Sequence, residues 1–391
     1  MAEFDAVVVG GGIQGLMVAW DIARRGGRPL LLERHALGSG ASNASLGIIH
    51  GGLRYLQTLD VRRWYRSRRE QLWFAHEFAA YTRSLSCVMP LYRGAFRSRT
   101  LFRTAFLLER TMARATGLAA LEQQAHLVTP AEVAGNYPIP QAGLTGGAVW
   151  PELAVDDPLG LMRDIAGRIE QAGGVVREHE EVVALDLAKG AARGVVARGA
   201  HGEGRYAARA VILCVGAASR CTARRFDRDY PALSARTLAF NMLLDVPAVS
   251  GQAVAVSPVP GRGRSYFLRD QGGRLLAGTY YAALKADLGS NTPLTVPPTL
   301  VAAFLKDLCA AAPWLEGAAV LETWAGLLPD VDGGGKTLRA HDLVLSHGDH
   351  GGPRGLWTLL GTKLTTAHAL AGEAVDRSLS NLPRERRQVH G

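Results

Sequence analysis

The hydrophobic pattern of the first 35 residues predicts a strand, a helix and a second strand, in that order. Residues Phe4–Val9 are apolar and rich in Val, which is typical of a buried parallel strand. Leu16–Arg25 carries apolar residues at helical spacing, and Gly26-Gly27 would end that helix. Pro29–Glu33 is apolar again. We therefore expect a βαβ unit at the start of the chain.

Later in the chain, one stretch again predicts alternating strands and helices, and another predicts mainly strands. From Asp156 onward the sequence predicts a helix at Leu159–Ala172, strands at Val175–Arg177, Val182–Leu187, Ala210–Val215 and Leu356–Leu360, and helices at Leu300–Ala311 and through Asp376. Between Arg236 and Tyr281 the pattern is rich in strands, at Leu238–Leu244, Ala253–Val256, Ser265–Leu268 and Leu275–Gly278. The chain is therefore predicted to be an α/β protein, with a Rossmann-type domain and a second α+β domain built on an antiparallel sheet.

A basic and aromatic segment, Arg62–Thr116, interrupts the α/β pattern. Arg residues alternate with Trp, Tyr and Phe residues there, and much of the segment has helical periodicity. A solvated basic helix face is the commonest explanation of such a pattern, while contact with a membrane surface and binding of RNA are alternatives.

Composition narrows the class of protein. The 391 residues are 48% hydrophobic and 20% charged, which is ordinary for a packed soluble protein and excludes a disordered or collagen-like chain. The formal net charge of +9 comes mainly from Arg, which can reflect genome composition, so we expect no nucleic-acid partner. The same charge could favour an anionic substrate or an acidic membrane surface.

The sequence has no recognisable membrane-spanning segment, secretory signal or cysteine metal motif, and this bears on where the protein is located and whether it binds a metal. No stretch reaches the roughly 18 uncharged apolar residues of a membrane-spanning helix, and no secretory signal is recognisable. The cysteines, Cys87, Cys214, Cys221 and Cys309, form no CxxC and no Cys/His metal spacing. We expect reduced thiols, no metal and a cytoplasmic protein, with peripheral contact at the inner face of the membrane as an option.

The glycines between the first strand and helix indicate a nucleotide site. Gly10 permits a tight turn, Gly12 lets the backbone approach a pyrophosphate, and Gly15 lets the helix and strand pack closely. The helix N-terminus then favours the phosphate charge. Glu33 ends the second strand, where it is placed to accept hydrogen bonds from an adenosine ribose, and it favours FAD or NAD over NADP.

Three other glycine-containing segments could approach the same ligand. Gly38–Gly52 is rich in small residues, which suits either a flexible loop or a close approach to a flat ligand. Gly216 follows a buried strand and would let the chain turn beneath a nucleotide. Gly361-Thr362-Lys363 stands between the last predicted strand and helix, where Lys363 supplies a nearby cation.

Together these segments resemble the D-amino-acid-oxidase-like superfamily of FAD oxidoreductases, most closely its FAD-dependent glycerol-3-phosphate dehydrogenase branch. The sharpest similarity is Ile49–Leu56 (IHGGLRYL), which resembles the LIHGGLRYL block of that branch. Val155–Asp157, Gly361–Thr366 and Thr323–Pro329 resemble its V-D-D, G-G-K-L-T-T and T-Y-S-G-V-R-P motifs. Tyr266–Thr279 is closer to the amine and amino-acid oxidases.

The chain departs from the dehydrogenase pattern at two places that bear on the substrate. Leu328 stands where the dehydrogenases carry an Arg implicated in binding the substrate phosphate. Tyr280-Tyr281 replaces the Thr-Asp that usually follows their Gly-Thr. These changes leave FAD binding in place and weaken the case for glycerol 3-phosphate itself.

The resemblance implies a discontinuous, Rossmann-type (GR2-like) FAD-binding domain at residues 1–85, 150–225 and 325–391, with a substrate-binding domain at 86–149 and 226–324. It implies non-covalent FAD, since the flavin-linking Cys of the sarcosine oxidases is absent. The implied FAD site consists of Gly10, Gly12, Ile13, Gln14, Gly15, Glu33, Arg34, Ser42, Ser45, Leu46, Val183, Gly216, Gly361, Thr362, Lys363, Leu364 and Thr365.

For the reaction, the resemblance implies oxidation of a small anionic hydroxy compound, glycerol 3-phosphate or a close relative, by hydride transfer to flavin N5. His50 would act as a base, or would only order its loop or contact the flavin. Arg54, Tyr55 and Arg339 would bind the anionic group. The alternative is an amino-acid or secondary-amine oxidase, in which Arg269 clamps a carboxylate. Quinone and O₂ both remain candidate electron acceptors.

Overall fold

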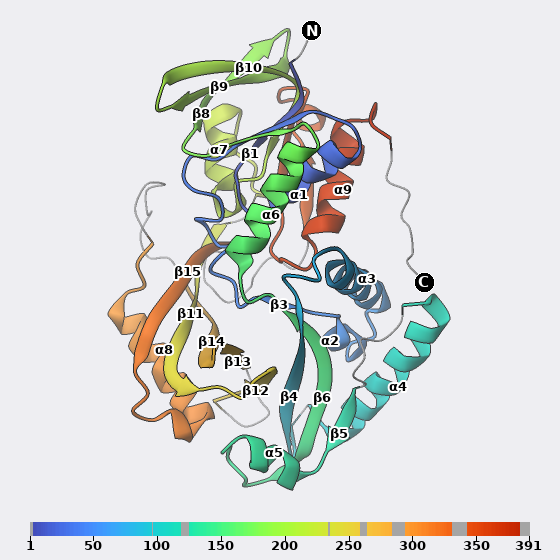
Figure 1. The fold of residues 1–391 in the computed structure, drawn as a ribbon, viewed down its shortest axis with the longest axis vertical. Coiled ribbons are helices and arrows are strands. Elements are labelled where there is room, and N and C mark those ends of the chain that lie inside the picture. The colour runs from blue at the N-terminus through green and yellow to red at the C-terminus, as the bar shows by residue number, and fades with distance from the viewer. Residues whose placement is uncertain are drawn as a thin grey trace.

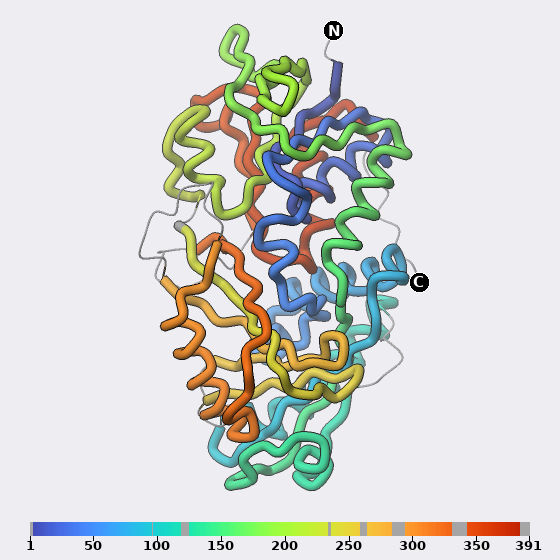
Figure 2. Tube along the Cα trace, turned by 60° about the vertical axis from the view of Figure 1, so that its left-hand side comes forward, coloured from blue at the N-terminus to red at the C-terminus, as the bar shows by residue number. Residues whose placement is uncertain are grey.

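The computed structural model describes residues 3–95, 97–118, 125–233, 235–258, 264–283, 294–330 and 342–383. Two β-sheets lie at opposite ends of an elongated molecule (Figures 1 and 2). Both the α/β class and the presence of an antiparallel second sheet are confirmed.

The first sheet has the strand order β16-β17-β10-β1-β2-β7, and most neighbouring pairs are parallel. Its strands are β1 (Phe4–Val9), β2 (Pro29–Leu32), β7 (Val175–Arg177), β10 (Gly202–Leu213), β16 (Leu343–Ser346) and β17 (Leu356–Leu360). An antiparallel ribbon of β8 (Glu181–Ala188) and β9 (Ala191–Gly199) continues from β10.

Both faces of the first sheet are covered at its centre, which explains why β1, β2 and the last four residues of β10 are apolar and almost fully buried. Ala6 and Val8 of β1 pack into the cluster formed with helices α1 (Ile13–Arg24), α6 (Pro158–Gln171) and α9 (Ala367–Ser378). Val7 and Val9 face the other way, toward residues of the β8–β9 ribbon. The short helices η1 (Gly216–Ala218), α7 (Ser219–Phe226) and η3 (Gly348–His350) flank this sheet.

The second sheet has the order β15-β11-β14-β13-β12-β4-β6-β3, with β5 paired to β6, and is antiparallel except between β12 and β4. Its strands are β3 (Ile48–Ile49), β4 (Arg83–Tyr92), β5 (His126–Val128), β6 (Leu144–Ala154), β11 (Ala235–Pro247), β12 (Gln252–Val256), β13 (Tyr266–Gln271), β14 (Arg274–Ala283) and β15 (Val320–Asp330). Helix α8 (Pro298–Ala311) and η2 (Pro313–Leu315) pack on one end, and α2 (Leu53–Leu56), α3 (Val61–Glu77), α4 (Arg99–Thr116) and α5 (Pro130–Asn136) lie near the other.

Three strands of the second sheet cross the domain limits expected from the sequence. β4 begins at Arg83, before the expected limit at residue 86, β6 runs on to Ala154, beyond the limit at 150, and β15 begins at Val320, before the limit at 325. Each is hydrogen-bonded along its length to strands of the second sheet.

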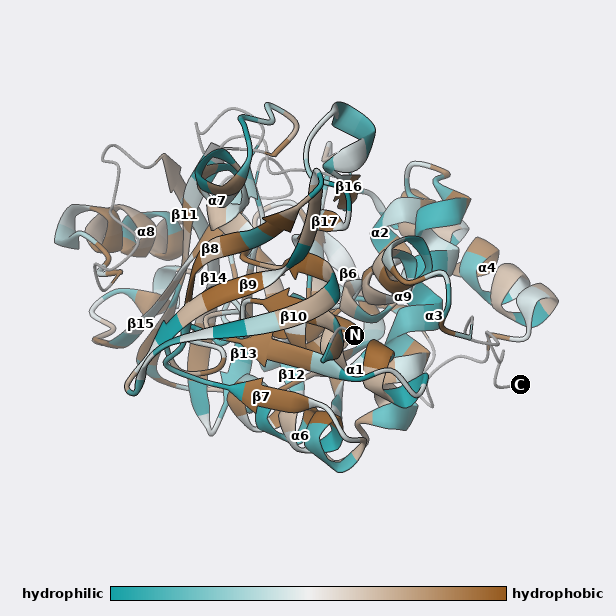
Figure 3. Cartoon of the chain, turned by 90° about the horizontal axis from the view of Figure 1, so that it is seen from above, coloured by the Kyte–Doolittle hydropathy of each residue, from teal (hydrophilic) through white to brown (hydrophobic). Residues whose placement is uncertain are grey.

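The basic and aromatic segment forms α3, β4 and α4. Its aromatic side chains Trp64, Phe74 and Phe102 are buried in the hydrophobic core, while most of α3 is hydrophilic (Figure 3). The interleaved pattern is thus explained by amphipathic helices that bury their aromatic residues. Among the described residues, we find no helix that is long and apolar enough to cross a membrane.

Candidate active site

The glycine turn between β1 and α1 has the close backbone approach that its sequence predicts. Gly10 has a φ of +111°, which residues with a Cβ rarely adopt. A Cβ on Gly15 would lie 1.9 Å from the carbonyl oxygen of Gly10, so only glycine fits there. Gly12 is the N-cap of α1, whose N-terminus therefore points out of this turn.

Glu33 lies beside the same turn. Its Oε2 accepts a hydrogen bond from the backbone N–H of Gly11 at 2.6 Å, and its Oε1 accepts one from the N–H of His35 at 2.8 Å. These two bonds fix the carboxylate at the end of β2, and each oxygen keeps a lone pair for a further donor.

A cavity of about 720 Å³ extends from this turn to the second sheet. That size falls in the range of about 300–1,000 Å³ that is usual for ligand sites. The predicted FAD-site residues that line it are Gly10, Gly12, Ile13, Gln14, Glu33, Arg34, Ser42, Ser45, Leu46, Gly216, Gly361, Thr362, Lys363 and Leu364. Gly15, Val183 and Thr365 do not line it: Gly15 packs on Gly10, and Val182, the neighbour of Val183, is the lining residue.

The first and last glycine turns meet at this cavity. The side-chain amide of Gln14 donates to the carbonyl oxygen of Lys363 at 3.2 Å, although the two residues are 349 positions apart. Oε1 of Gln14 is buried and has no hydrogen-bond partner among the described residues. A buried acceptor without a donor calls for one from a ligand, such as a ribityl or ribose hydroxyl. These features fit a dinucleotide that extends between the two turns.

Beside the cavity, two cations converge on one phenol. Lys363 Nζ donates to the Tyr55 hydroxyl at 2.7 Å, and Arg54 Nη2 donates to it at 2.9 Å. Burial alone would raise the pKa of Tyr55, but the two cations and their hydrogen bonds outweigh it and lower that pKa. Of these three residues, only Lys363 lines the cavity itself. With both lone pairs engaged, the phenol can offer its own proton to an anion.

The imidazole of His50 contacts the buried carboxylate of Glu152, a residue that the sequence analysis missed. Nδ1 of His50 lies 3.2 Å from Oε1 of Glu152, and the backbone N–H of His50 donates to Thr365 Oγ1 at 3.3 Å. The imidazole is 38% exposed, while the Glu152 side chain is 4% exposed. The one signal for Glu152 was an isolated acid in the apolar run Ala148–Val155.

The second sheet contributes the opposite wall. Ala239 of β11 is aligned with Tyr281 of β14 and with Gly326 of β15, and all three line the cavity together with Leu328. The structure thus places Leu328 and Tyr281 on the ligand side of the sheet. Burial raises the pKa of the Tyr281 phenol, so this side chain carries no charge at neutral pH.

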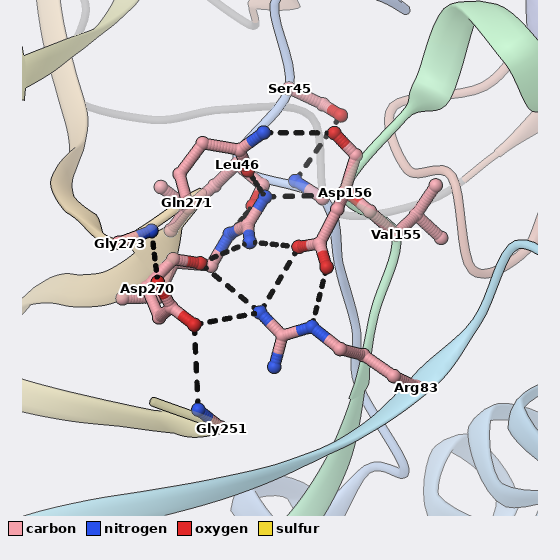
Figure 4. A network of polar contacts seen from close by, with 11 residues as sticks. Ser45, Leu46, Arg83, Val155, Asp156, Gly251, Asp270, Gln271 and Gly273 are labelled. Atoms are coloured by element: carbon pink, nitrogen blue, oxygen red, sulfur yellow. Dashed lines mark hydrogen bonds and ion pairs between the residues drawn. The ribbon is translucent and has the colours of Figure 1, made fainter. Parts of the chain in front are cut away.

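Arg269 has a different position from the one that a carboxylate clamp requires. Its guanidinium is 1% exposed, and it donates to Asp156 Oδ1 at 2.6 Å, to the Leu46 carbonyl at 2.6 Å and to Gln271 Oε1 at 2.6 Å. Arg83 pairs with the same Asp156 carboxylate (Figure 4). Arg269 therefore does not face the cavity, and the expectation that it clamps a substrate carboxylate is not supported.

This ion-pair network instead positions the loop that carries Ser45 and Leu46. Both residues line the cavity, and Arg269 joins their loop to β13. Although burial alone would raise the pKa of Asp156, its hydrogen bonds and ion pairs with Arg83 and Arg269 lower that pKa on balance. Arg339, the remaining predicted substrate-binding residue, lies outside the described residues.

Comparison with known proteins shows the family to which the chain belongs. The family described as FAD dependent oxidoreductase (DAO) matches residues 5–377 of the chain. The chain belongs to this family and is an FAD-dependent oxidoreductase, as its glycine turns and its resemblance to the family indicated.

Two relatives carry a more specific name. The chain is 26% identical over 392 residues to glycerol-3-phosphate dehydrogenase 1 of Mycobacterium bovis, which covers 96% of this chain and 73% of that protein. It is 30% identical over 181 residues to the aerobic glycerol-3-phosphate dehydrogenase of Staphylococcus saprophyticus. That second match covers 46% of this chain and only 32% of the relative's length.

Solved structures confirm the fold. The glycerol-3-phosphate dehydrogenase of Bacillus halodurans, complexed with FAD, superposes with a TM-score of 0.71 at 20% identity, covering 98% of this chain and 67% of that one. Glycine oxidase from Geobacillus kaustophilus gives a TM-score of 0.68 at 18% identity, covering 99% and 100% of the two chains. The same fold thus accommodates enzymes named for a phosphate ester and for an amino acid.

Proposed function

We propose that this FAD-dependent oxidoreductase oxidises a small anionic hydroxy compound, glycerol 3-phosphate or a close relative of it. The observation that carries the proposal is the convergence of Arg54 and Lys363 on the Tyr55 hydroxyl beside the cavity. Bound FAD supplies the hydride acceptor for such an oxidation.

The cluster of Arg54, Tyr55 and Lys363 suits the anionic end of the substrate. Two fixed positive charges and a phenol that can donate a proton favour a phosphate or carboxylate over a neutral group. Arg54 itself is exposed, so its guanidinium is accessible to a ligand at the mouth of the site.

The wall formed by Leu328 and Tyr281 favours a relative of glycerol 3-phosphate over that compound itself. Both residues line the cavity, and neither supplies a charge there. A hydrogen bond to a charged group contributes roughly 1.5–3 kcal/mol, so a Leu in place of an Arg changes affinity for phosphate about ten- to a hundredfold. A substrate with an apolar portion beside its hydroxyl group suits this wall.

Oxidation of an amino acid or secondary amine is the second candidate, and the glycine oxidase fold is the observation that favours it. In this chain that candidate relied on Arg269 as the carboxylate clamp. Because the guanidinium of Arg269 already donates to Asp156, Leu46 and Gln271, we rank oxidation of an amino acid or amine second.

Anaerobic mixing of the FAD-loaded protein with a panel of compounds tests the proposal. The panel contains glycerol 3-phosphate, 2-hydroxy acids of increasing side-chain length, glycine and sarcosine. We expect an anionic hydroxy compound to bleach the flavin absorbance fastest. Bleaching by the amino compounds alone would contradict the proposal, and a neutral polyol that reacts equally fast would remove the role of Arg54 and Lys363.

A further inference from the structure

The buried carboxylate of Glu152 is surrounded by hydrogen-bond donors. Oε1 accepts from the indole Nε1–H of Trp150 at 2.9 Å, and Oε2 accepts from the backbone N–H of Gly51 at 2.6 Å and from Gln71 Nε2 at 2.8 Å. The fourth contact is Nδ1 of His50, 3.2 Å from Oε1. All four contacts of the carboxylate are thus with groups that can donate, and an ionised carboxylate can only accept.

The orientation of Gln71 is fixed from its other side. Its Oε1 accepts from Arg68 Nη1 at 2.7 Å, and its Nε2 also donates to the carbonyl oxygen of Ile49 at 3.0 Å. Arg68 is 2% exposed and pairs with Glu109 at 3.3 Å. The amide of Gln71 therefore has to present its N–H group to Glu152, and the arrangement cannot be inverted by turning that amide over.

An acceptor-only carboxylate decides which nitrogen of His50 carries the proton. Nδ1 has to donate to Glu152, so the neutral imidazole keeps its proton on Nδ1 and leaves the lone pair on Nε2. Among the described residues, Nε2 has no hydrogen-bond partner. The ring also packs against Phe267, with 5.7 Å between the ring centroids, which limits its rotation.

We propose that Glu152 is a positioning residue that keeps His50 in the Nδ1–H form, so that Nε2 accepts the proton of the substrate. This role rests on the proposed function. As the substrate C–H bond breaks and its electron pair leaves with the hydrogen for the bound cofactor, the O–H bond breaks and its proton bonds to Nε2. A C=O bond forms on the product, and the ionised Glu152 stabilises the resulting imidazolium.

The proton position can be measured without any substrate. The FAD-loaded protein is labelled with ¹⁵N-histidine, and a His50→Gln sample identifies the signals of residue 50. The two ring nitrogens are observed by NMR at rising pH until their chemical shifts stop changing, which marks the neutral ring. We expect Nδ1 to carry the proton. A wild-type His50 with its proton on Nε2 would overturn the proposal, whatever the substrate turns out to be.

The role of the charge is tested with the Glu152→Gln variant, and Glu170→Gln is its matched control. The control makes the same substitution at an exposed acid of α6. We expect Glu152→Gln to lower kcat by about 10–100-fold, the range for groups that orient metal-ligating histidines, with KM changed less than threefold, and Glu170→Gln to stay near the wild type.

A folded, FAD-loaded Glu152→Gln protein with wild-type kcat would overturn the proposal. If that variant does not fold, the NMR measurement on the wild type still tests whether Glu152 sets the proton position on His50. If no hydroxy or amino compound reduces the flavin, the proposed function fails, whereas the NMR measurement still reports which nitrogen of His50 carries the proton.

Discussion

Arg269 and Asp156 form an ion pair, 2.6 Å from Nη1 to Oδ1, between β13 and the residues that follow β6. Arg269 also donates to the carbonyl oxygen of Leu46, so this pair connects the second sheet to a loop that lines the cofactor cavity. The sequence assigns Arg269 to substrate binding, but its guanidinium instead holds the backbone of Leu46, which lines the cavity.

Asp156→Asn should destabilise the protein, because it leaves the buried guanidinium of Arg269 without its charged partner. Breaking a fully buried pair costs about 3–5 kcal/mol; Asp156 is 40% exposed, so we expect a smaller loss. Urea unfolding at neutral pH measures it. Asp349→Asn, in the exposed η3 turn, is the control, and equal stability of all three proteins would contradict the prediction.

The contribution of Asp156 should also depend on pH. Its folded pKa lies below the ordinary value of 3.8, so the ionised form stabilises the folded state above that value. The stabilisation is lost as the pH falls through the lower folded pKa. We expect the gap in unfolding free energy between wild type and Asp156→Asn to be constant near pH 6 and to shrink below about pH 4. A gap that grows on acidification would have the wrong sign.

Lys363→Met should raise the pKa of Tyr55 toward its ordinary value of 10.0, because one of the two cations that lower it is removed. NMR titration of ¹³C-labelled tyrosine measures the change, and a Tyr55→Phe sample assigns the signal. Lys306→Met, an exposed lysine of α8, is the control and should leave the titration unchanged. An unaltered Tyr55 titration in Lys363→Met would show that the phenol is not coupled to this cation.

Leu328→Arg should improve the binding of phosphate-bearing substrates. A new charged hydrogen bond on the cavity wall is worth roughly 1.5–3 kcal/mol, so the KM for glycerol 3-phosphate should fall about ten- to a hundredfold. Leu321→Arg, on the same strand but 49% exposed, keeps the added charge away from the cavity. If both variants lower KM alike, the effect is one of net charge and the assignment of this wall is wrong.

Two glycine-to-alanine substitutions should have opposite effects. Gly15→Ala places a Cβ 1.9 Å from the Gly10 carbonyl oxygen, so we expect loss of FAD binding or of the fold. Gly167 lies in α6 with nothing within 4 Å of its Cβ position, and Gly167→Ala should add roughly 0.5–1 kcal/mol of stability. Thermal unfolding and the flavin absorbance of the purified proteins measure both effects. A yellow, stable Gly15→Ala protein would contradict the role of that turn.

Local patterns were enough to predict the elements around the nucleotide. β1, β7 and β17 have the predicted bounds, and α1 begins within three residues of its expected start. These elements are apolar on both faces or strictly periodic, and glycines mark their ends. Several strands were missed, among them β4, β6 and β15. Arg83–Tyr92 lies between two helical segments, and β15 includes polar residues on its exposed part.

Residues whose roles depend on distant partners could not be predicted from the sequence. The position of Arg269 depends on Asp156 and Leu46, more than 100 positions away along the chain. Likewise, Glu152 reaches His50 only because β6 pairs with β3, which ends one residue before the histidine. His50, Arg54 and Lys363 were identified because a known motif surrounds them.

The hydrogen bond from Gln14 to Lys363 spans 349 residues of sequence. One wall of the cofactor cavity is therefore synthesised long before the facing wall. During translation, a chain that has not yet emerged past residue 363 lacks the turn that faces the first glycine turn across the dinucleotide. Complete capture of the flavin therefore has to wait until residue 363 has emerged.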